Sequence, residues 1–270
     1  MHDAVLQGYN LVPVLKTLPA DLETPVSVLL KLRSREQPCF LLESVEGGET
    51  IARFSFIGVK PLEVLRQTGT DPLLEAERRL KQFRWFPVQE LPGFSGGFVG
   101  YLSYDCVHYY EPKVPVPETD RLGIPESILM LFESFVVFDH LHHLIRVVAH
   151  CDLLRHANED EAYDDCLNSI ESMIAKLRAQ LDHQDDPVHL FSDKDEHAED
   201  QQYYENAVKK LKQHICKGDI IQAVPSRRIS SKLGASPLSV YRHLRTISPS
   251  PYMFFLDFID FQVCFSVSFF

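Results

Sequence analysis

Cysteine is scarce in this 270-residue chain, and its cysteines are not arranged for metal binding. The six cysteines include no C-x-x-C pair, and their spacing matches neither a zinc site nor the disulfide framework of a small secreted domain. We therefore expect reduced and mostly buried thiols. The six positions are Cys39, Cys106, Cys151, Cys166, Cys216 and Cys264.

Several common functional signatures are also missing. The sequence contains no G-x-x-x-x-G-K or G-x-G-x-x-G motif, which excludes the commonest phosphate-binding loops. The formal net charge of -11, without a cluster of Lys and Arg, disfavours a nucleic-acid-binding protein. No apolar stretch reaches the roughly 20 residues of a membrane helix, and no secretory signal is visible. We expect a cytoplasmic protein with no membrane or nucleic-acid partner.

The hydrophobic pattern predicts an α+β fold with mostly antiparallel sheets and flanking helices. Thr24 and Pro25 indicate the start of a helix that ends near Ser34. The apolar run Cys39–Ser44 and the alternating segment Arg53–Ile57 predict strands. Further helices are expected over residues 71–83, 160–181, 200–217 and 236–246.

The middle of the chain predicts more strands. Three glycines interrupt the apolar strand expected at Ser95–Asp105, and a glycine inside a strand marks a bulge or a close backbone approach. The run Ile128–Phe138 predicts one strand of a hairpin with Leu144–His150. Its turn, Asp139–His143, contains three histidines, but no further Cys or His set completes a four-ligand site, so an unliganded turn is favoured.

A polar segment rich in Asp and His divides the chain into two parts. We predict an N-terminal domain over residues 1–181, a linker over 182–199 and the start of a second domain over 200–270. In the second part, Gly218 is placed to end a helix, and Asp219–Ser230 predicts a strand. Tyr252–Phe261 predicts two strands joined by a turn.

Two segments carry chemistry beyond packing. Leu41–Ser44 is an apolar strand that ends in a carboxylate and a hydroxyl group, and Ser248–Phe255 is a proline-rich turn that opens into an aromatic strand. A free amino acid needs a carboxylate or carbonyl for its ammonium group, donors for its carboxylate and flat apolar walls. Together the two segments offer these groups.

Four motifs in order resemble anthranilate synthase component I, the large chorismate-using subunit of that enzyme. Each motif alone is modest, but four in the same order and spacing, within a similarity from about Tyr9 to Val263, are highly specific. The motifs are LLESVEGGE (41–49) with RFSFIG (53–58), GGFVGYLSYD (96–105), GDIIQAVPSRR (218–228) and YRHLRTISPSPYMFF (241–255).

The resemblance implies an enzyme of tryptophan biosynthesis and its regulation. Members of the family convert chorismate and ammonia to anthranilate and pyruvate, require Mg²⁺ and receive ammonia from a glutamine amidotransferase subunit. L-Tryptophan inhibits them from a pocket far from the active site. The fold implied is the N-terminal part of the two-sheet chorismate-utilising fold.

The same resemblance implies which residues line the tryptophan pocket. Ser44 would donate to the ligand carboxylate, and a proline-fixed turn would preorganise the opposite wall. The family has Asn where Ser248 precedes the first proline of this turn. The implied residues are Glu43, Ser44, Arg53, Pro251, Tyr252 and Met253.

Gln222 is the one implied catalytic residue in this chain. Relatives that add water to chorismate have a lysine base at this place, and a neutral amide cannot deprotonate water. Glutamine therefore suits an enzyme whose nucleophile is ammonia. A strand glutamine hydrogen-bonded to its neighbours is the alternative, and the sequence leaves both open.

The last residues depart from the family pattern. The family continues beyond residues 261–263 with a Gly-Ala-Ser-Pro-Glu stretch and a catalytic domain, whereas this chain reads Cys264–Phe270, an apolar segment. The resemblance places the Mg²⁺ carboxylates, the catalytic histidine and the substrate-binding arginine in that missing part. We expect a truncated chain with an unpaired apolar edge strand and no activity by itself.

Two other functions are consistent with the sequence. The large subunit of aminodeoxychorismate synthase shares the fold and a tryptophan pocket, and it differs in a later segment. A non-catalytic fragment that binds tryptophan or the amidotransferase is the second alternative.

Overall fold

The computed structural model describes residues 2–44, 53–91, 93–116, 120, 122–181, 198–228, 230 and 232–266. The chain forms two compact units, one made of Met1–His183 with Tyr241–Phe270 and the other of Gln184–Val240. Residues from Tyr241 onward thus pack with the N-terminal residues, whereas the sequence predicts one domain start over residues 200–270. The division into 1–181, 182–199 and 200–270 stays a prediction, and residues 182–197 lie outside the described residues.

Helices and strands follow one another irregularly along the chain. In the described part of the chain, no helix is long and apolar enough to cross a membrane. The elements are α1 (His2–Leu6), β1 (Leu11–Pro19), α2 (Pro25–Leu32), β2 (Cys39–Glu43), β3 (Phe54–Val59), β4 (Glu63–Gln67), α4 (Pro72–Leu80), β5 (Gly97–Leu102), η1 (Tyr104–Tyr109), β6 (Ser127–Phe132), β7 (Ser134–Asp139), β8 (Leu144–Asp152), α5 (Glu159–Arg178), α6 (Ala198–Lys217), α7 (Pro237–Ile247), β9 (Met253–Asp257) and β10 (Gln262–Ser266).

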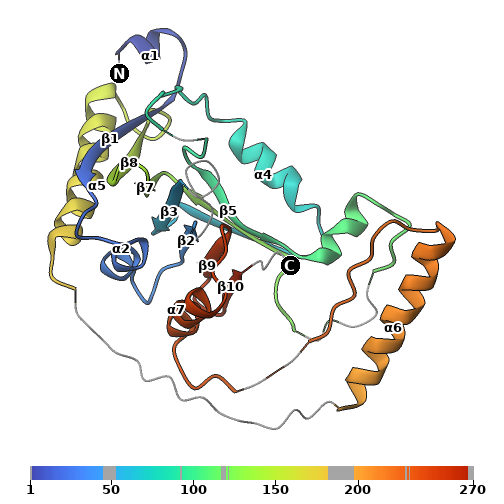
Figure 1. Ribbon diagram of the computed structural model, residues 1–270. Coiled ribbons are helices and arrows are strands. Elements are labelled where there is room, and N and C mark those ends of the chain that lie inside the picture. The colour runs from blue at the N-terminus through green and yellow to red at the C-terminus, as the bar shows by residue number, and fades with distance from the viewer. Residues whose placement is uncertain are drawn as a thin grey trace. The chain divides into compact units, whose positions relative to one another are not determined.

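The described strands form two sheets in the first unit (Figure 1). The larger sheet has the order β1-β8-β7-β3-β2-β9-β10, and the smaller has the order β4-β6-β5. Neighbouring strands are antiparallel throughout both sheets. The expected α+β class with mostly antiparallel sheets is therefore confirmed.

The apolar run over residues 128–138 forms two strands and not the single strand expected. β6 pairs with β4 and β5 in the smaller sheet, whereas β7 pairs with β3 and β8 in the larger one. Glu133 lies between the two strands, while Ile128 and Val136 on either side are fully buried. Because both strands are buried, the apolar run carries no sign of the change of sheet. The hairpin of β7 with β8 is confirmed.

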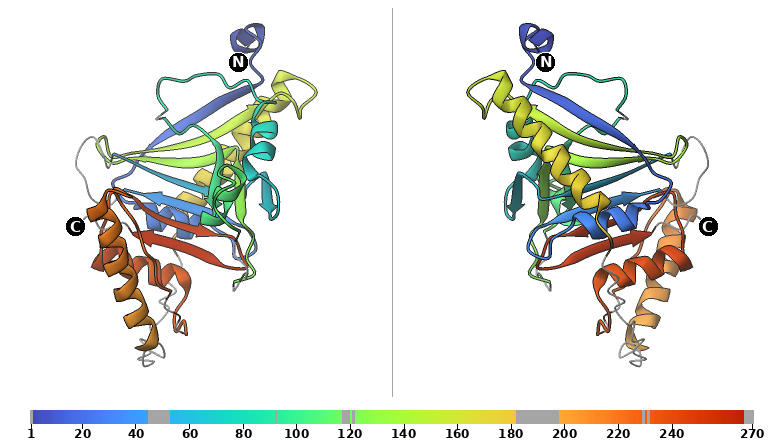
Figure 2. Two further views of the ribbon diagram at one scale, coloured as in Figure 1. Left: turned by 90° about the vertical axis from the view of Figure 1, so that its right-hand side faces the viewer. Right: turned by 90° about the vertical axis from the view of Figure 1, so that its left-hand side faces the viewer.

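Helices α2 and α5 cover one face of the larger sheet (Figure 2). The Thr24 side chain accepts a hydrogen bond from the Ser27 amide, and Pro25 occupies the first turn of α2, as predicted. Lys31 of α2 donates to the Leu177 carbonyl oxygen of α5 at 2.8 Å. The buried stripe of α5 consists of Ala162, Cys166, Ile170, Met173, Ile174 and Leu177.

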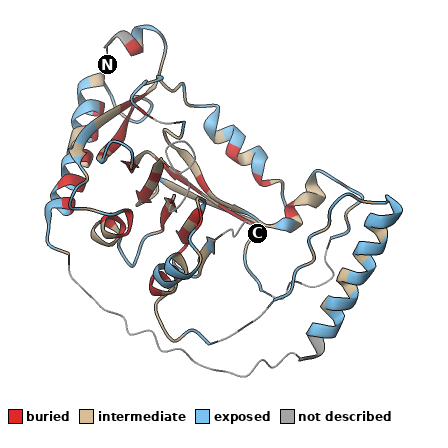
Figure 3. Ribbon diagram, in the orientation of Figure 1, coloured by how far each residue is buried: buried red, intermediate tan, exposed pale blue. Residues whose placement is uncertain are grey.

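A core cluster joins the two sheets. Its strands are among the buried segments in Figure 3. The rings of Phe40 in β2 and Phe132 in β6 contact edge to face with centroids 4.7 Å apart. Burial of each large apolar side chain stabilises the folded state by about 1.5–3 kcal/mol relative to an exposed one. The buried members are Phe40, Val99, Ile128, Met130, Phe132, Leu256 and Phe258.

In the second unit, α6 ends where the sequence predicts. Gly218 has a φ of 82°, and its amide donates to the Ile215 carbonyl oxygen at 3.0 Å. The Asp219 amide donates to the His214 carbonyl oxygen, also at 3.0 Å. This pair of bonds is a Schellman motif, and it requires the left-handed conformation that glycine adopts freely.

The strand predicted for Asp219–Ser230 is wrong. The described residues of this segment form no strand, and the side chains of Ile221 and Val224 are 97% and 81% exposed. A strand needs a neighbour to satisfy its backbone hydrogen bonds. The described part of the second unit contains no strand that could pair with this segment.

We predict that Gly100→Ala destabilises the first unit. A Cβ atom at this position in β5 would lie 1.8 Å from the Ile128 carbonyl oxygen of β6, so the two strands would have to separate. We expect a loss of about 2 kcal/mol or more in the free energy of unfolding, measured by urea denaturation. Gly93→Ala is the matched control, since nothing lies within 4 Å of its added Cβ. Equal midpoints for the two variants would contradict the prediction.

Candidate functional site

A pocket of about 380 Å³ opens where three neighbouring strands of the larger sheet begin or end. β2 ends at Glu43, while β3 and β9 begin beside it in the sheet (Figure 1). The antiparallel register places Glu43 opposite Met253. The lining residues are Leu42, Glu43, Ser44, Arg53, Phe54, Phe56, Pro251, Tyr252, Met253 and Phe254.

The Glu43 side chain is the buried charge of this pocket. Its Oε2 atom accepts a hydrogen bond from the Tyr241 hydroxyl at 2.9 Å, and the Arg245 Nε atom forms an ion pair with it at 2.8 Å. Burial and the Glu43 carboxylate together raise the pKa of Tyr241, so its hydroxyl stays a donor. The Oε1 atom of Glu43 is buried without a hydrogen-bond partner among the described residues. An unpartnered buried carboxylate oxygen is costly unless a ligand or water reaches it.

The opposite wall is a turn between α7 and β9. The Ser248 amide donates to the Leu244 carbonyl oxygen at 2.8 Å, which ends the helix. Ser250 is buried, and its hydroxyl accepts a hydrogen bond from the Tyr252 amide at 3.1 Å. Pro251 fixes one backbone angle of the turn. The turn is therefore held in place before any ligand arrives.

Ser44 is tied to β3 through its backbone. Its amide donates to the Ser55 hydroxyl at 3.2 Å, and the same Ser55 oxygen lies 2.7 Å from the His140 Nε2 atom. Ser55 is fully buried. The contact fixes the end of β2 at the rim of the pocket, where Ser44 is half-buried.

Arg53 lines the pocket but its guanidinium group is bound by Asp139. The Nε and Nη2 atoms donate to the two carboxylate oxygens of Asp139 at 3.1 and 2.9 Å. The guanidinium carbon also lies 4.6 Å from the centroid of the Phe54 ring. Arg53 thus joins β3 to the turn after β7 and holds one aromatic wall.

Asp139 is fully buried and receives hydrogen bonds from three side chains. Burial raises the pKa of its carboxyl group, but the bonds from Arg53, from the side chain and backbone of His142 and from Arg146 outweigh this effect. The pKa of Asp139 therefore lies well below its ordinary value. The turn at 139–143 is an ion-pair network whose carboxylate already has partners.

The structure brings six of the seven residues singled out in the sequence into this one pocket. Gln222 is the exception, because it lies in the second unit, where its side chain is exposed and its segment forms no strand. The six are Glu43, Ser44, Arg53, Pro251, Tyr252 and Met253.

Sequence reasoning missed the residues that support the pocket from behind. Tyr241 and Arg245 are four residues apart on α7, a spacing that places both on one face of a helix. This spacing was the signal that the sequence offered. For Asp139 the sequence offered only a turn position after an apolar strand.

The described residues contain no group of three His, Cys, Asp or Glu side chains that would hold a metal ion. The described residues therefore do not fit a Mg²⁺ site.

The fold and the pocket define an α+β protein of two antiparallel sheets with a pocket of small-ligand size at its strand ends. Comparison with known proteins refines this class. The chain belongs to the chorismate binding enzyme family, whose pattern matches residues 37–269.

Known relatives agree with the resemblance stated from the motifs. The chain is 41% identical over 259 residues to the probable anthranilate synthase component 1 of Schizosaccharomyces pombe, and 37% identical over 268 residues to anthranilate synthase component 1 of Saccharomyces cerevisiae. Each match covers 94% of this chain and 52% of the relative. The chain therefore spans about half the length of the curated relatives it matches.

A solved structure shows the same fold. The chain superposes on anthranilate synthase component I of Streptococcus pneumoniae with a TM-score of 0.60 and 26% sequence identity. The match covers 80% of this chain and 50% of that one. The resemblance to anthranilate synthase component I and the fold class it implied are thus both confirmed.

We predict that Asp139→Asn lowers the free energy of unfolding at pH 7 by about 3 kcal/mol, because two arginines lose their buried counter-charge. Folding lowers the pKa of Asp139. Its contribution to the free energy of unfolding is therefore fully present above its pKa in the unfolded chain, about 3.9, and is lost as the pH falls toward its pKa in the folded chain. The difference between wild type and variant, measured by urea denaturation, should therefore be constant from pH 7 to 5 and shrink below about pH 4.

Asp260→Asn is the control for this experiment. Asp260 also pairs with an arginine, Arg66, but its side chain is 62% exposed. An exposed pair contributes about 0–1 kcal/mol. A pH-independent loss in Asp139→Asn would contradict the assigned role.

Proposed function

We propose that the whole protein is anthranilate synthase component I, which forms anthranilate and pyruvate from chorismate and ammonia, and that these residues supply its L-tryptophan pocket. The pocket would make tryptophan the feedback inhibitor of its own synthesis. One observation carries the proposal: Glu43, whose buried Oε1 atom has no partner among the described residues, lines a pocket together with the other five residues that the resemblance implied.

Glu43 suits the ammonium group of an amino acid. Its Oε2 atom is already bound by Tyr241 and paired with Arg245, whereas Oε1 has no partner among the described residues. A bound ammonium group would donate to Oε1 in a charge-assisted hydrogen bond. Burial of Glu43 strengthens this interaction, because little water competes for the carboxylate.

The other parts of tryptophan match the remaining walls. Ser44, at the end of β2, carries a hydroxyl that can donate to the ligand carboxylate. Phe54, Phe56, Met253 and Tyr252 offer flat or adaptable apolar surface for an indole ring. The volume of about 380 Å³ lies in the range typical of small-ligand pockets.

The remaining parts of the function are also proposals. Mg²⁺ as cofactor, a glutamine amidotransferase subunit as partner and a cytoplasmic location follow from the resemblance. Gln222 would face chorismate only when its segment forms a strand of a complete chorismate-binding domain. The resemblance places the metal ligands and the catalytic histidine beyond Val263.

The comparisons favour this function over the large subunit of aminodeoxychorismate synthase. The relatives described above carry the name anthranilate synthase component 1, at up to 41% identity. A fragment that binds tryptophan without turnover is the second candidate, and it uses the same pocket.

We predict that the chain binds L-tryptophan and that Glu43→Gln weakens this binding about 10- to 100-fold, measured by isothermal titration calorimetry. The variant keeps an oxygen for Tyr241 but loses the charge that attracts the ammonium group, a change of about 1.5–3 kcal/mol. Ser44→Ala should weaken binding about fivefold or more, through loss of one donor.

Glu171→Gln is the matched control, because this glutamate pairs with Lys16 at an exposed position outside the pocket. It should bind L-tryptophan as wild type does. Indole, which lacks both charged groups, should not distinguish wild type from Glu43→Gln. Equal affinity of Glu43→Gln and wild type for L-tryptophan would refute the assignment of the pocket.

We predict no anthranilate from the 270-residue chain alone with chorismate, ammonium and Mg²⁺, followed by anthranilate fluorescence. The reason is that the implied metal ligands are not among its described residues. The complete anthranilate synthase component 1 of Saccharomyces cerevisiae under the same conditions is the positive control. Fluorescence that depends on Mg²⁺ with the 270-residue chain would show that these residues do contain a catalytic site.

A further inference from the structure

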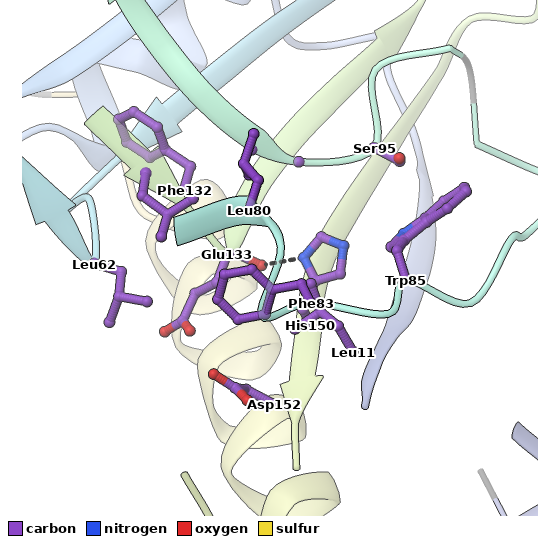
Figure 4. A pocket seen from close by; sticks show the side chains of 13 residues that line it. Leu11, Leu62, Leu80, Phe83, Trp85, Ser95, Phe132, Glu133, His150 and Asp152 are labelled. Carbon is purple, nitrogen blue, oxygen red and sulfur yellow. Dashed lines mark hydrogen bonds between the residues drawn. The ribbon is translucent and has the colours of Figure 1, made fainter. Parts of the chain in front are cut away.

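A second cavity, of about 270 Å³, lies in the first unit and shares no residue with the tryptophan pocket (Figure 4). Strands of both sheets and the segment between α4 and β5 form its walls. Most of its lining is apolar. The lining residues are Leu11, Leu62, Leu80, Phe83, Trp85, Ser95, Gly96, Gly97, Leu131, Phe132, Glu133, His150 and Asp152.

His150 lines this cavity, and one of its ring nitrogens is an unused acceptor. The residue is 6% exposed, and its Nδ1 atom lies 2.7 Å from the Glu133 carbonyl oxygen (Figure 4). Since a carbonyl oxygen only accepts, Nδ1 carries the proton, and in the neutral ring Nε2 is left with a lone pair. Burial lowers the pKa of His150 against the opposing effects of the Glu133 and Ser95 backbone and of Asp152, which favours the neutral ring. The Ser95 backbone lies near enough to the ring to affect its pKa, but no described residue meets hydrogen-bond geometry with the buried Nε2 atom.

Trp85 lines the same cavity, and its indole nitrogen is an unused donor. Its Nε1–H group is buried and has no acceptor in the described part of the chain. A buried polar group without a partner costs about 1–3 kcal/mol. Two such groups, one donor and one acceptor, on the wall of one cavity indicate that the occupant supplies both partners.

Gly96 shows that the wall is shaped around the histidine. Its φ is 126°, and a Cβ atom there would lie 2.8 Å from the His150 Cε1 atom. Any other residue would strain the backbone and push the ring out of place. The position of the acceptor is therefore built into the chain.

The charged groups of the cavity disfavour an anionic ligand. Glu133 and Asp152 both line it, and Arg155 pairs with each of them, at 2.7 Å to the Asp152 carboxylate. Two carboxylates against one guanidinium group leave excess negative charge. A carboxylate or phosphate ligand would be repelled.

We propose that this cavity binds a neutral, hydroxylated single-ring aromatic molecule of the phenol class. Its hydroxyl groups accept from the Trp85 Nε1–H group and donate to the His150 Nε2 atom, while the ring packs on the leucine and phenylalanine side chains. The size agrees, because an apolar cavity of about 150 Å³ holds one benzene ring, and this one has room for polar substituents. Nothing in the proposed function requires this ligand.

Trp85 makes the test direct, because it is the only tryptophan in the chain. Its indole N–H gives a single, unambiguous signal in a ¹H–¹⁵N spectrum of the ¹⁵N-labelled chain. Titration with phenol should shift this signal in a saturable manner. Toluene, which has no hydroxyl group, should bind at least fivefold more weakly, and benzoate should leave the signal in place.

Two variants separate this cavity from the tryptophan pocket. Trp85→Phe keeps an aromatic ring but removes the donor, so calorimetry should give at least fivefold weaker phenol binding and unchanged toluene binding. Glu43→Gln should bind phenol as wild type does, even if the tryptophan proposal fails. An indole signal that phenol does not move, or equal affinity for phenol and toluene, would overturn the proposal and leave water as the occupant.

Discussion

The pairing of β2 with β9 is the constraint on which the site depends. Glu43 and Met253 stand opposite each other in the register, and the same pairing brings α7 behind the pocket. The contact between Glu43 and Tyr241 joins residues 198 positions apart in the sequence. Because β2 lies between β3 and β9, its end is surrounded on both sides, and a carboxylate there is buried by the geometry of the sheet.

Two buried carboxylates in this unit have opposite roles because their oxygens are occupied differently. Both oxygens of Asp139 accept hydrogen bonds from arginine or histidine, so it joins strands and turns. Glu43 uses one oxygen for Tyr241 and Arg245, and its other oxygen has no partner among the described residues. A buried carboxylate whose two oxygens both have hydrogen-bond partners holds the fold together. One with a partner on a single oxygen can still bind a ligand.

The same criterion distinguishes the second cavity from an ordinary packing defect. An apolar void has nothing to offer a polar molecule, and it stays dry. Here the lining residues include Trp85 and His150, whose donor and acceptor have no partner among the described residues. Gly96 has no side chain and so leaves room for the imidazole ring. The two pockets described here are thus both lined by residues with buried polar atoms that no other described residue satisfies.

The sequence by itself determined the local structure and the family. Capping at Thr24, the stop at Gly218 and the β7–β8 hairpin were predictable because neighbouring residues decide them. The pocket residues came only from the family resemblance that the motifs carry. Only the tertiary structure decided that residues 128–138 change sheets, that Ile221 and Val224 are exposed outside any strand, and that Arg53 is bound by Asp139. These outcomes depend on partners distant in sequence, and hydrophobic periodicity reports burial without naming the partner.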